Sequence, residues 1–217
     1  MPNKYLDTLI LSTFLLVLLA CPAAMAQEGY SLMQDNTHFR QKMAESTAGT
    51  HSIASDFVQL KQLSFLEEEV SSKGKFYFRK ENMLRWEYTE PFSYIIIFSH
   101  DSILIRNEDK TNIYDASSGR MFREINNIML SMVNGTILDD NDFSFAYYES
   151  DKAFKLVLTP LDENMKEFLS EIHLFISKEN YSVDELMMIE RSGDFTNIRF
   201  MNKRLNEDIP DHIFDLH

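Results

Sequence analysis

The 217-residue chain carries 34 acidic and 21 basic side chains, a formal net charge of −13. Such a charge is repelled by nucleic-acid phosphates and by anionic lipid headgroups, so we expect no nucleic-acid partner. Seventeen Phe and nine Tyr beside six Gly favour a β-rich chain, and the length suits one domain with a substantial core.

The first residues have the pattern of an export signal. Residues 9–19 form an apolar run that is too short to span a bilayer, and Ala-Met-Ala at 24–26 is a small-x-small cleavage site. We interpret residues 1–26 as a signal peptide and residues 27–217 as the mature domain.

A second interpretation of the same segment stays open. Leu-Leu-Ala-Cys at residues 18–21 fits a lipobox, in which Cys21 would be acylated and become the mature N-terminus. Cys21 is the single cysteine. Cleavage after Ala26 would therefore leave no disulfide framework and no thiolate zinc site within one chain.

The mature chain begins with loose helical spacing over residues 30–48, which Gly49 would end. From residue 53 the apolar period changes to that of strands separated by polar turns. The clearest alternation is that of Leu84, Trp86 and Tyr88 with polar neighbours. The expected strands are residues 53–63, 72–79, 84–89, 94–98, 103–106, 111–114, 143–148, 154–158, 168–176, 183–190 and 196–201.

One helix interrupts the strands, over residues 122–134. Ile125, Ile128, Met129, Met132 and Val133 fall at i, i+3, i+4, i+7 and i+8, which is the spacing of an amphipathic helix. This face has two interpretations. It is ordinary core packing, or it is a lid that adapts to variable acyl chains because Met is flexible and polarisable.

About ten antiparallel strands with two helices predict an α+β domain built on a large curved sheet. Amphipathic helices can cover the apolar concave face of such a sheet, and an imperfect cover leaves a hydrophobic cleft. The rings of Phe76, Phe78, Trp86 and Tyr88 are core by default, and they line a ligand only if the concave face is incompletely filled.

Enzymatic patterns are weak. The six histidines show no metal-ligand spacing, and no nucleophile elbow, phosphate-binding loop or dinucleotide fingerprint occurs. The pair His100-Asp101 is typical of a hairpin turn, and the Glu67–Glu69 run is typical of a solvated loop. We therefore expect no catalytic site, no metal and no cofactor.

Several short motifs follow one another in order over residues 53–214. They are Asp56-Phe-Val-Gln59, Gly74-Lys-Phe-Tyr-Phe-Arg-Lys80, Leu84-Arg-Trp-Glu-Tyr88 followed by Pro91, Ile95-Ile-Ile-Phe-Ser-His-Asp101, Ile113-Tyr-Asp115, and Leu156-Val-Leu-Thr-Pro160 followed by Lys166, Phe168 and Ile172. In this order and spacing they resemble the family of periplasmic outer-membrane lipoprotein carriers, LolA.

The resemblance implies an unclosed antiparallel β half-barrel of ten to eleven strands, with a helical lid over a hydrophobic cavity. The family's lid-fastening Arg would align with Lys80, which lacks the planar fork of Arg, and the Pro that follows it is Glu81 here. Arg79 is one residue off and would point to the opposite face. The expected cavity and lid residues are Phe76, Phe78, Leu84, Trp86, Tyr88, Ile95, Ile97, Ile125, Ile128, Met129 and Met132.

The implied function is periplasmic transport of acylated lipoproteins from an inner-membrane ATP-driven release complex to an outer-membrane acceptor. A monomer is expected, because shuttling by a buried acyl chain is easiest for one. Two alternatives stay open: a protein of the same fold anchored through Cys21, acting as acceptor or as lipid or lipoprotein sensor, and an exported hydrolase with an atypical site.

Overall fold

The computed structural model describes residues 29–64, 69–80, 82–99, 102–107, 110–115 and 120–215. The signal-peptide and lipobox predictions, and the His100-Asp101 turn, lie outside these residues.

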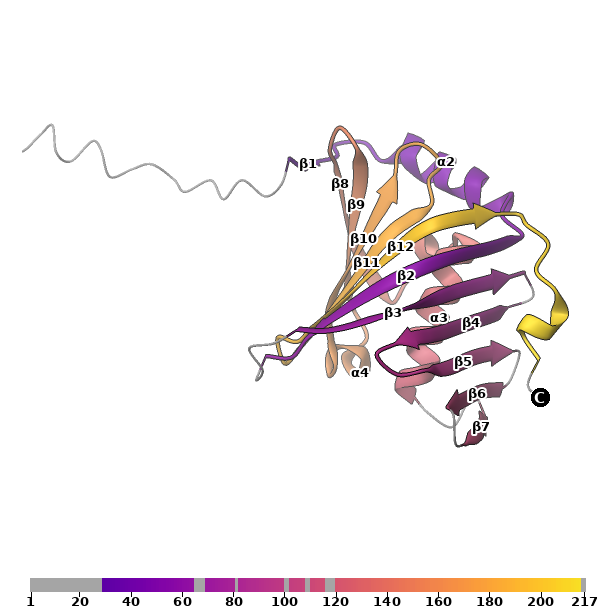
Figure 1. Ribbon diagram of the computed structural model, residues 1–217. Coiled ribbons are helices and arrows are strands. Elements are labelled where there is room, and N and C mark those ends of the chain that lie inside the picture. The colour runs from indigo at the N-terminus through magenta and orange to yellow at the C-terminus, as the bar shows by residue number, and fades with distance from the viewer. Residues whose placement is uncertain are drawn as a thin grey trace, which may run out of the picture.

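The described chain forms one antiparallel sheet with the strand order β1-β8-β9-β10-β11-β12-β2-β3-β4-β5-β6-β7. β1 and β7 are the two edges and do not pair with each other, so the sheet bends strongly without closing (Figure 1). The strands are β1 (Ser31–Leu32), β2 (Ser52–Gln62), β3 (Glu69–Arg79), β4 (Met83–Glu90), β5 (Tyr94–Ser99), β6 (Ser102–Asn107), β7 (Thr111–Asp115), β8 (Phe143–Glu149), β9 (Ala153–Pro160), β10 (Leu169–Ser177), β11 (Val183–Glu190) and β12 (Phe195–Leu205).

This arrangement confirms the predicted α+β, unclosed half-barrel, with one strand more than the expected ten to eleven. The additional strand is β1, where Ser31 and Leu32 pair with β8. Because Ser31 and Leu32 belong to β1, the helix expected from residue 30 begins only at Thr37. The helical elements are α2 (Thr37–Ala48), α3 (Arg120–Asn134), α4 (Glu163–Lys166) and the short 3-10 turns η1 (Thr136–Asp139) and η2 (Asp211–Ile213).

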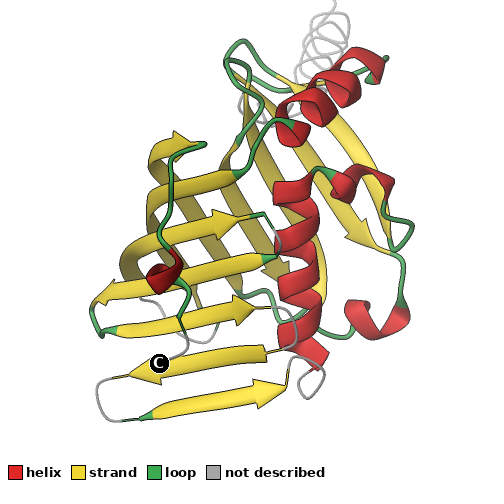
Figure 2. Cartoon of the chain, turned by 90° about the vertical axis from the view of Figure 1, so that its right-hand side faces the viewer, coloured by secondary structure: helices red, strands yellow, loops and turns green. Residues whose placement is uncertain are grey.

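The position of α3 follows from the strand order. β7 and β8 are consecutive in the chain, yet β7 is one edge of the sheet and β8 lies beside the other edge. Their connection must therefore cross the sheet, and it carries α3 and η1. Figure 2 shows α3 standing along the concave side, while α2 lies across one end.

Side-chain alternation gives the sheet two distinct faces. Phe78, Leu84 and Phe98 are direct neighbours across β3, β4 and β5, and all three are buried on the inner face. Arg85 and Ile97 form the neighbouring pair one residue along, so their side chains point to the outer face.

The C-terminal segment, residues 206–215, runs along the outer side of β3 to β5 (Figures 1 and 2). Arg79 donates a hydrogen bond to the carbonyl of Ile209 at 2.9 Å, and Arg85 donates to that of Ile213, also at 2.9 Å. Charge-assisted bonds of this kind hold the segment on the outer face. The prediction that Arg79 points away from the inner face is thus confirmed.

Because Gly74 on β3 has no side chain, neighbouring atoms approach its backbone more closely than any other residue type would permit. A Cβ atom there would lie 2.1 Å from the carbonyl oxygen of Glu87 and 2.7 Å from the ring of Phe57. We expect Gly74→Ala to lower the free energy of unfolding by about 1–3 kcal/mol, because the backbone and a core ring must both shift. Urea unfolding measures the change. Gly49→Ala is the matched control, since a Cβ at Gly49 meets nothing closer than 3.6 Å; equal losses in both variants would contradict this packing.

Candidate functional site

An aromatic cluster forms the inner wall of the sheet over β2, β3, β4 and β12. The ring of Phe57 lies 5.1 Å from that of Trp86 and 5.0 Å from that of Tyr88, both edge-on. Phe76 lies 4.7 Å from Trp86 and 5.5 Å from Phe200. These separations suit attractive quadrupole contacts, which stabilise the apolar wall.

The cluster ends in two stacked tyrosines. The rings of Tyr88 and Tyr94 are 4.1 Å apart and nearly parallel, and the Tyr88 hydroxyl donates to Gln59 Oε1 at 2.9 Å. Burial disfavours the charged phenolate, so it raises the pKa of Tyr88 well above its usual range and raises the pKa of Tyr94 as well.

This burial predicts an alkaline loss of stability. In the unfolded chain the two phenols release protons above pH of about 10, whereas the folded protein retains them. The unfolded state then binds fewer protons, so the free energy of unfolding should fall as the pH rises above that value. Urea unfolding between pH of about 9 and about 11 should show a shallower decline in Tyr88→Phe/Tyr94→Phe than in the wild type. The same slope in both proteins would contradict the burial of these hydroxyls.

The apolar face of α3 rests on the inner side of the sheet. Ile128, Met129 and Met132 are each only 5–6% exposed and belong to the main core cluster, as do Ile137 and Leu138 of η1. The predicted amphipathic character of residues 122–134 is therefore confirmed for the part of α3 whose side chains are described. In this structure, the apolar face of α3 is packed as part of the core.

The C-terminal end of α3 is joined closely to α2. Gly135 has a φ of 74°, and a Cβ atom on it would lie 2.8 Å from Thr47 Cβ. Just beyond, Arg40 of α2 forms an ion pair with Asp139 at 2.8 Å and donates to the Tyr147 hydroxyl at 3.1 Å. This end of the helix is thus fixed to its surroundings.

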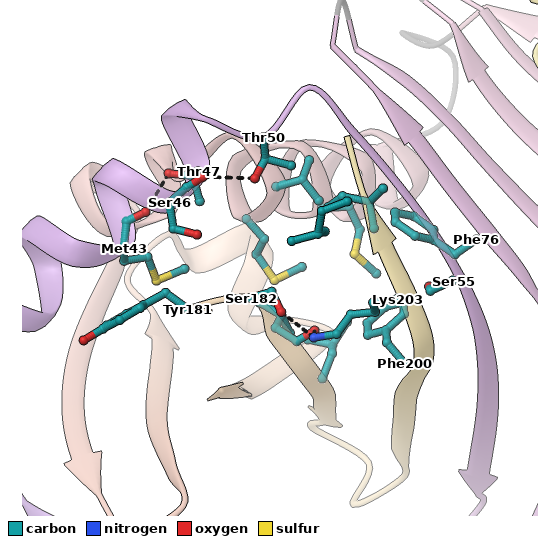
Figure 3. Close-up of a pocket in the computed structure, with 17 residues that line it drawn as sticks. Met43, Ser46, Thr47, Thr50, Ser55, Phe76, Tyr181, Ser182, Phe200 and Lys203 are labelled. Carbon is teal, nitrogen blue, oxygen red and sulfur yellow. Dashed lines mark hydrogen bonds between the residues drawn. The ribbon is translucent and has the colours of Figure 1, made fainter. Parts of the chain in front are cut away.

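A largely apolar pocket lies between α2, α3 and the sheet (Figure 3). Its cavity volume is about 60 Å³. This volume is smaller than a complete acyl chain requires. Its lining includes Ser46, Ser55, Phe76, Met132, Phe200 and Lys203.

The predicted wall residues are together on the inner face. They are Phe76, Phe78, Leu84, Trp86 and Tyr88, all buried.

Two predicted cavity residues are on the wrong face. Ile95 pairs with Glu87 and Ile97 pairs with Arg85, so both point to the outer face. Ile97 is fully buried there. Ile125 lies in the part of α3 whose side chains are not described.

Lys80, the predicted lid-fastening residue, reaches a helix end. Its Nζ donates to the carbonyl oxygen of Ala48 at 2.9 Å, at the C-terminus of α2. A cation there complements the helix dipole and satisfies a terminal carbonyl. The contact is with α2 and not with α3.

Sequence reasoning missed the part of the pocket built by β2, β11 and β12. Ser55, Leu186, Phe200 and Lys203 all line it. On β12, Ile198 and Phe200 flank the charged Arg199, and this short alternation indicated that Phe200 shares a face with Ile198.

The described residues include no group of His, Cys, Asp or Glu side chains arranged to hold a metal ion. Within the same residues, no helix is both long enough and apolar enough to cross a membrane.

A family model described as outer membrane lipoprotein carrier protein LolA matches residues 48–217. The chain belongs to the LolA family. The resemblance inferred from residues 53–214 is thereby confirmed. No curated protein matches the sequence.

The chain is similar to several solved structures at low sequence identity. A LolA superfamily protein from Nitrosomonas europaea is 13% identical, with 81% of this chain and 97% of that chain covered and a TM-score of 0.43. Lipoprotein LppX from Mycobacterium tuberculosis is 11% identical, with 79% and 96% covered and a TM-score of 0.46. An uncharacterised conserved protein from Thermus thermophilus is 9% identical, with 82% and 93% covered and a TM-score of 0.50.

Proposed function

We propose that this LolA family protein is a periplasmic carrier that binds the acyl chains of lipoproteins between α3 and the concave sheet, and moves them from the inner to the outer membrane. The observation that carries the proposal is the placement of α3. Its apolar face, with Ile128, Met129 and Met132, covers an aromatic wall beside an apolar pocket. A helix that crosses a sheet as part of a connection can move while the sheet stays intact.

The energetics favour moderate affinity. Burial of an acyl chain gains about 0.8 kcal/mol for each CH₂ group. Loading displaces the buried side chains of α3 from the same wall. The loss of this burial offsets part of the gain from the acyl chain. The cargo is therefore held in transit and can still be handed over.

The partners follow from this role. We propose that an ATP-driven inner-membrane release complex loads the protein and that an outer-membrane acceptor unloads it, with no catalytic step by the carrier itself. The net charge of −13 favours basic contact surfaces on both partners.

Native mass spectrometry of the protein purified from the periplasm tests the proposal. We expect a complex with a triacylated lipopeptide, and no complex with the same peptide lacking its acyl chains. If the two peptides behave alike, the carrier function is contradicted.

The lipobox at residues 18–21 favours a second candidate, a membrane-anchored acceptor or sensor of the same fold. Mass spectrometry of the mature N-terminus separates the two. An N-terminus at Gln27 fits the soluble carrier, and an acylated Cys21 fits the anchored protein.

A further inference from the structure

Ser55 places a buried hydroxyl in the wall of the pocket without a hydrogen-bond partner. The residue is 4% exposed, and its Oγ has no partner among the described residues. Figure 3 shows it beside Phe76 and Phe200. Leaving such a hydroxyl unpaired costs about 1–3 kcal/mol, so an unpaired one at a pocket wall calls for an explanation.

A β-bulge of β12 lies directly beside Ser55. Asp56 pairs with Met201 and Ala54 pairs with Arg204, so two residues of β12 stand opposite Ser55 without regular pairing. Asn202, one of the two, has a φ of 53°. Bulges of this kind redirect side chains and occur beside functional sites.

The second bulge residue is Lys203, whose side chain turns into the pocket. Its ammonium group donates to the Ser182 hydroxyl, to the carbonyl of Val183 at 3.0 Å and to the carboxylate of Asp184. These acceptors use the three donors of the group, and Asp184 neutralises its charge. Lys203 is therefore part of the pocket rim with its donors already used. The hydroxyl of Ser55 is a donor that is not used.

A neutral donor in an apolar wall selects a neutral acceptor. A carboxylate buried beside Ser55 would lack a free cation and would be strongly disfavoured. A carbonyl oxygen accepts one hydrogen bond without carrying charge.

We propose that Ser55 donates a hydrogen bond to the ester or amide carbonyl that joins a bound acyl chain to its cargo. This inference rests on the proposed carrier function and adds its chemical specificity. The site takes acyl esters and amides in preference to alkyl ethers and free fatty acids.

The test compares two ligands with equal tails. One is a diacylglyceryl-cysteine peptide, and the other is its dialkyl ether analogue, in which each ester carbonyl is replaced by a methylene. We expect the wild type to bind the ester about tenfold more tightly, the effect of one hydrogen bond to an otherwise unpaired group. Ser55→Ala should bind both ligands equally. Isothermal titration calorimetry measures the affinities.

Ser46→Ala is the matched control. Ser46 also lines the pocket, but its hydroxyl already donates to the carbonyl of Asn180 at 2.8 Å. This variant should keep the preference for the ester. Ser55→Ala should unfold at the same temperature as the wild type or a higher one, because the hydroxyl has no partner to lose.

The outcomes separate the two proposals. If the wild type binds ester and ether equally, or if Ser55→Ala loses stability, the role of Ser55 is contradicted while the carrier function stands. Tighter binding of palmitate than of methyl palmitate at neutral pH would also overturn the role of Ser55, since it would reveal a cationic site. If neither peptide binds, the carrier function itself fails.

Discussion

Met132→Ala should weaken the folded protein and strengthen its binding of acylated ligands. Met132 belongs to α3, is 5% exposed and packs in the core against the sheet. Its truncation should lower the free energy of unfolding by about 2–5 kcal/mol. In the proposed carrier, loading displaces this side chain, so its truncation reduces what the ligand must displace, and affinity for a triacylated lipopeptide should rise about tenfold or more. Urea unfolding and calorimetric titration measure the two effects.

For Met132→Ala, the stability of the fold is expected to fall while the affinity for the ligand rises, and this combination tests the competition between α3 and the ligand. Met201→Ala is the matched control, because Met201 is 38% exposed and points to the outer face of β12. It should change neither quantity appreciably. A Met132→Ala protein that loses affinity together with stability would show that Met132 is a fixed part of the wall and that α3 does not compete with the ligand.

The second large effect is expected at the aromatic wall. Phe57 is 1% exposed and contacts both Trp86 and Tyr88 edge-on. Phe57→Ala should lower the free energy of unfolding by about 3–5 kcal/mol, since it removes these contacts and leaves a cavity. The emission of Trp86, the single tryptophan of the chain, should shift as its surroundings loosen. Urea unfolding followed by fluorescence records both.

Phe92→Ala gives the comparison for this loss. Phe92 is 78% exposed in the turn between β4 and β5. Its truncation should change stability by less than about 0.5 kcal/mol. Similar losses at Phe57 and Phe92 would contradict the packed inner wall.

The sequence predicts the fold well where local patterns are strong. The alternation of Leu84, Trp86 and Tyr88 places all three on one face, and the helical spacing in residues 122–134 identifies the buried side of α3. β1 could not be predicted because a strand of two residues is too short to show an alternation of apolar and polar side chains. The pairing that holds it depends on β8, which is distant in sequence.

The errors on β5 have a physical cause. Residues 94–98 are apolar throughout, so alternation carries no information about which side faces inward. Ile97 is buried on the outer face, on the side of the sheet that the C-terminal segment follows (Figure 1). That segment lies far along the chain from β5, so no local pattern in β5 indicates that it runs along the outer side.

The pocket rim could not be predicted at all from local patterns. Ser55 looks like an ordinary polar residue in a strand, and Lys203 looks like a surface cation. Their meeting depends on the register shift between β12 and β2. A bulge moves side chains by one position and leaves no periodic signal.

Quenching of Trp86 by a brominated acyl chain tests whether acyl chains bind against the inner wall beneath α3. Trp86 is 6% exposed on the inner wall beneath α3, and bromine quenches indole emission at contact. Titration with a lipopeptide brominated along its acyl chains should quench the emission saturably, and the unbrominated lipopeptide should compete. Emission that stays constant while calorimetry records binding would place the acyl chains elsewhere and contradict the account.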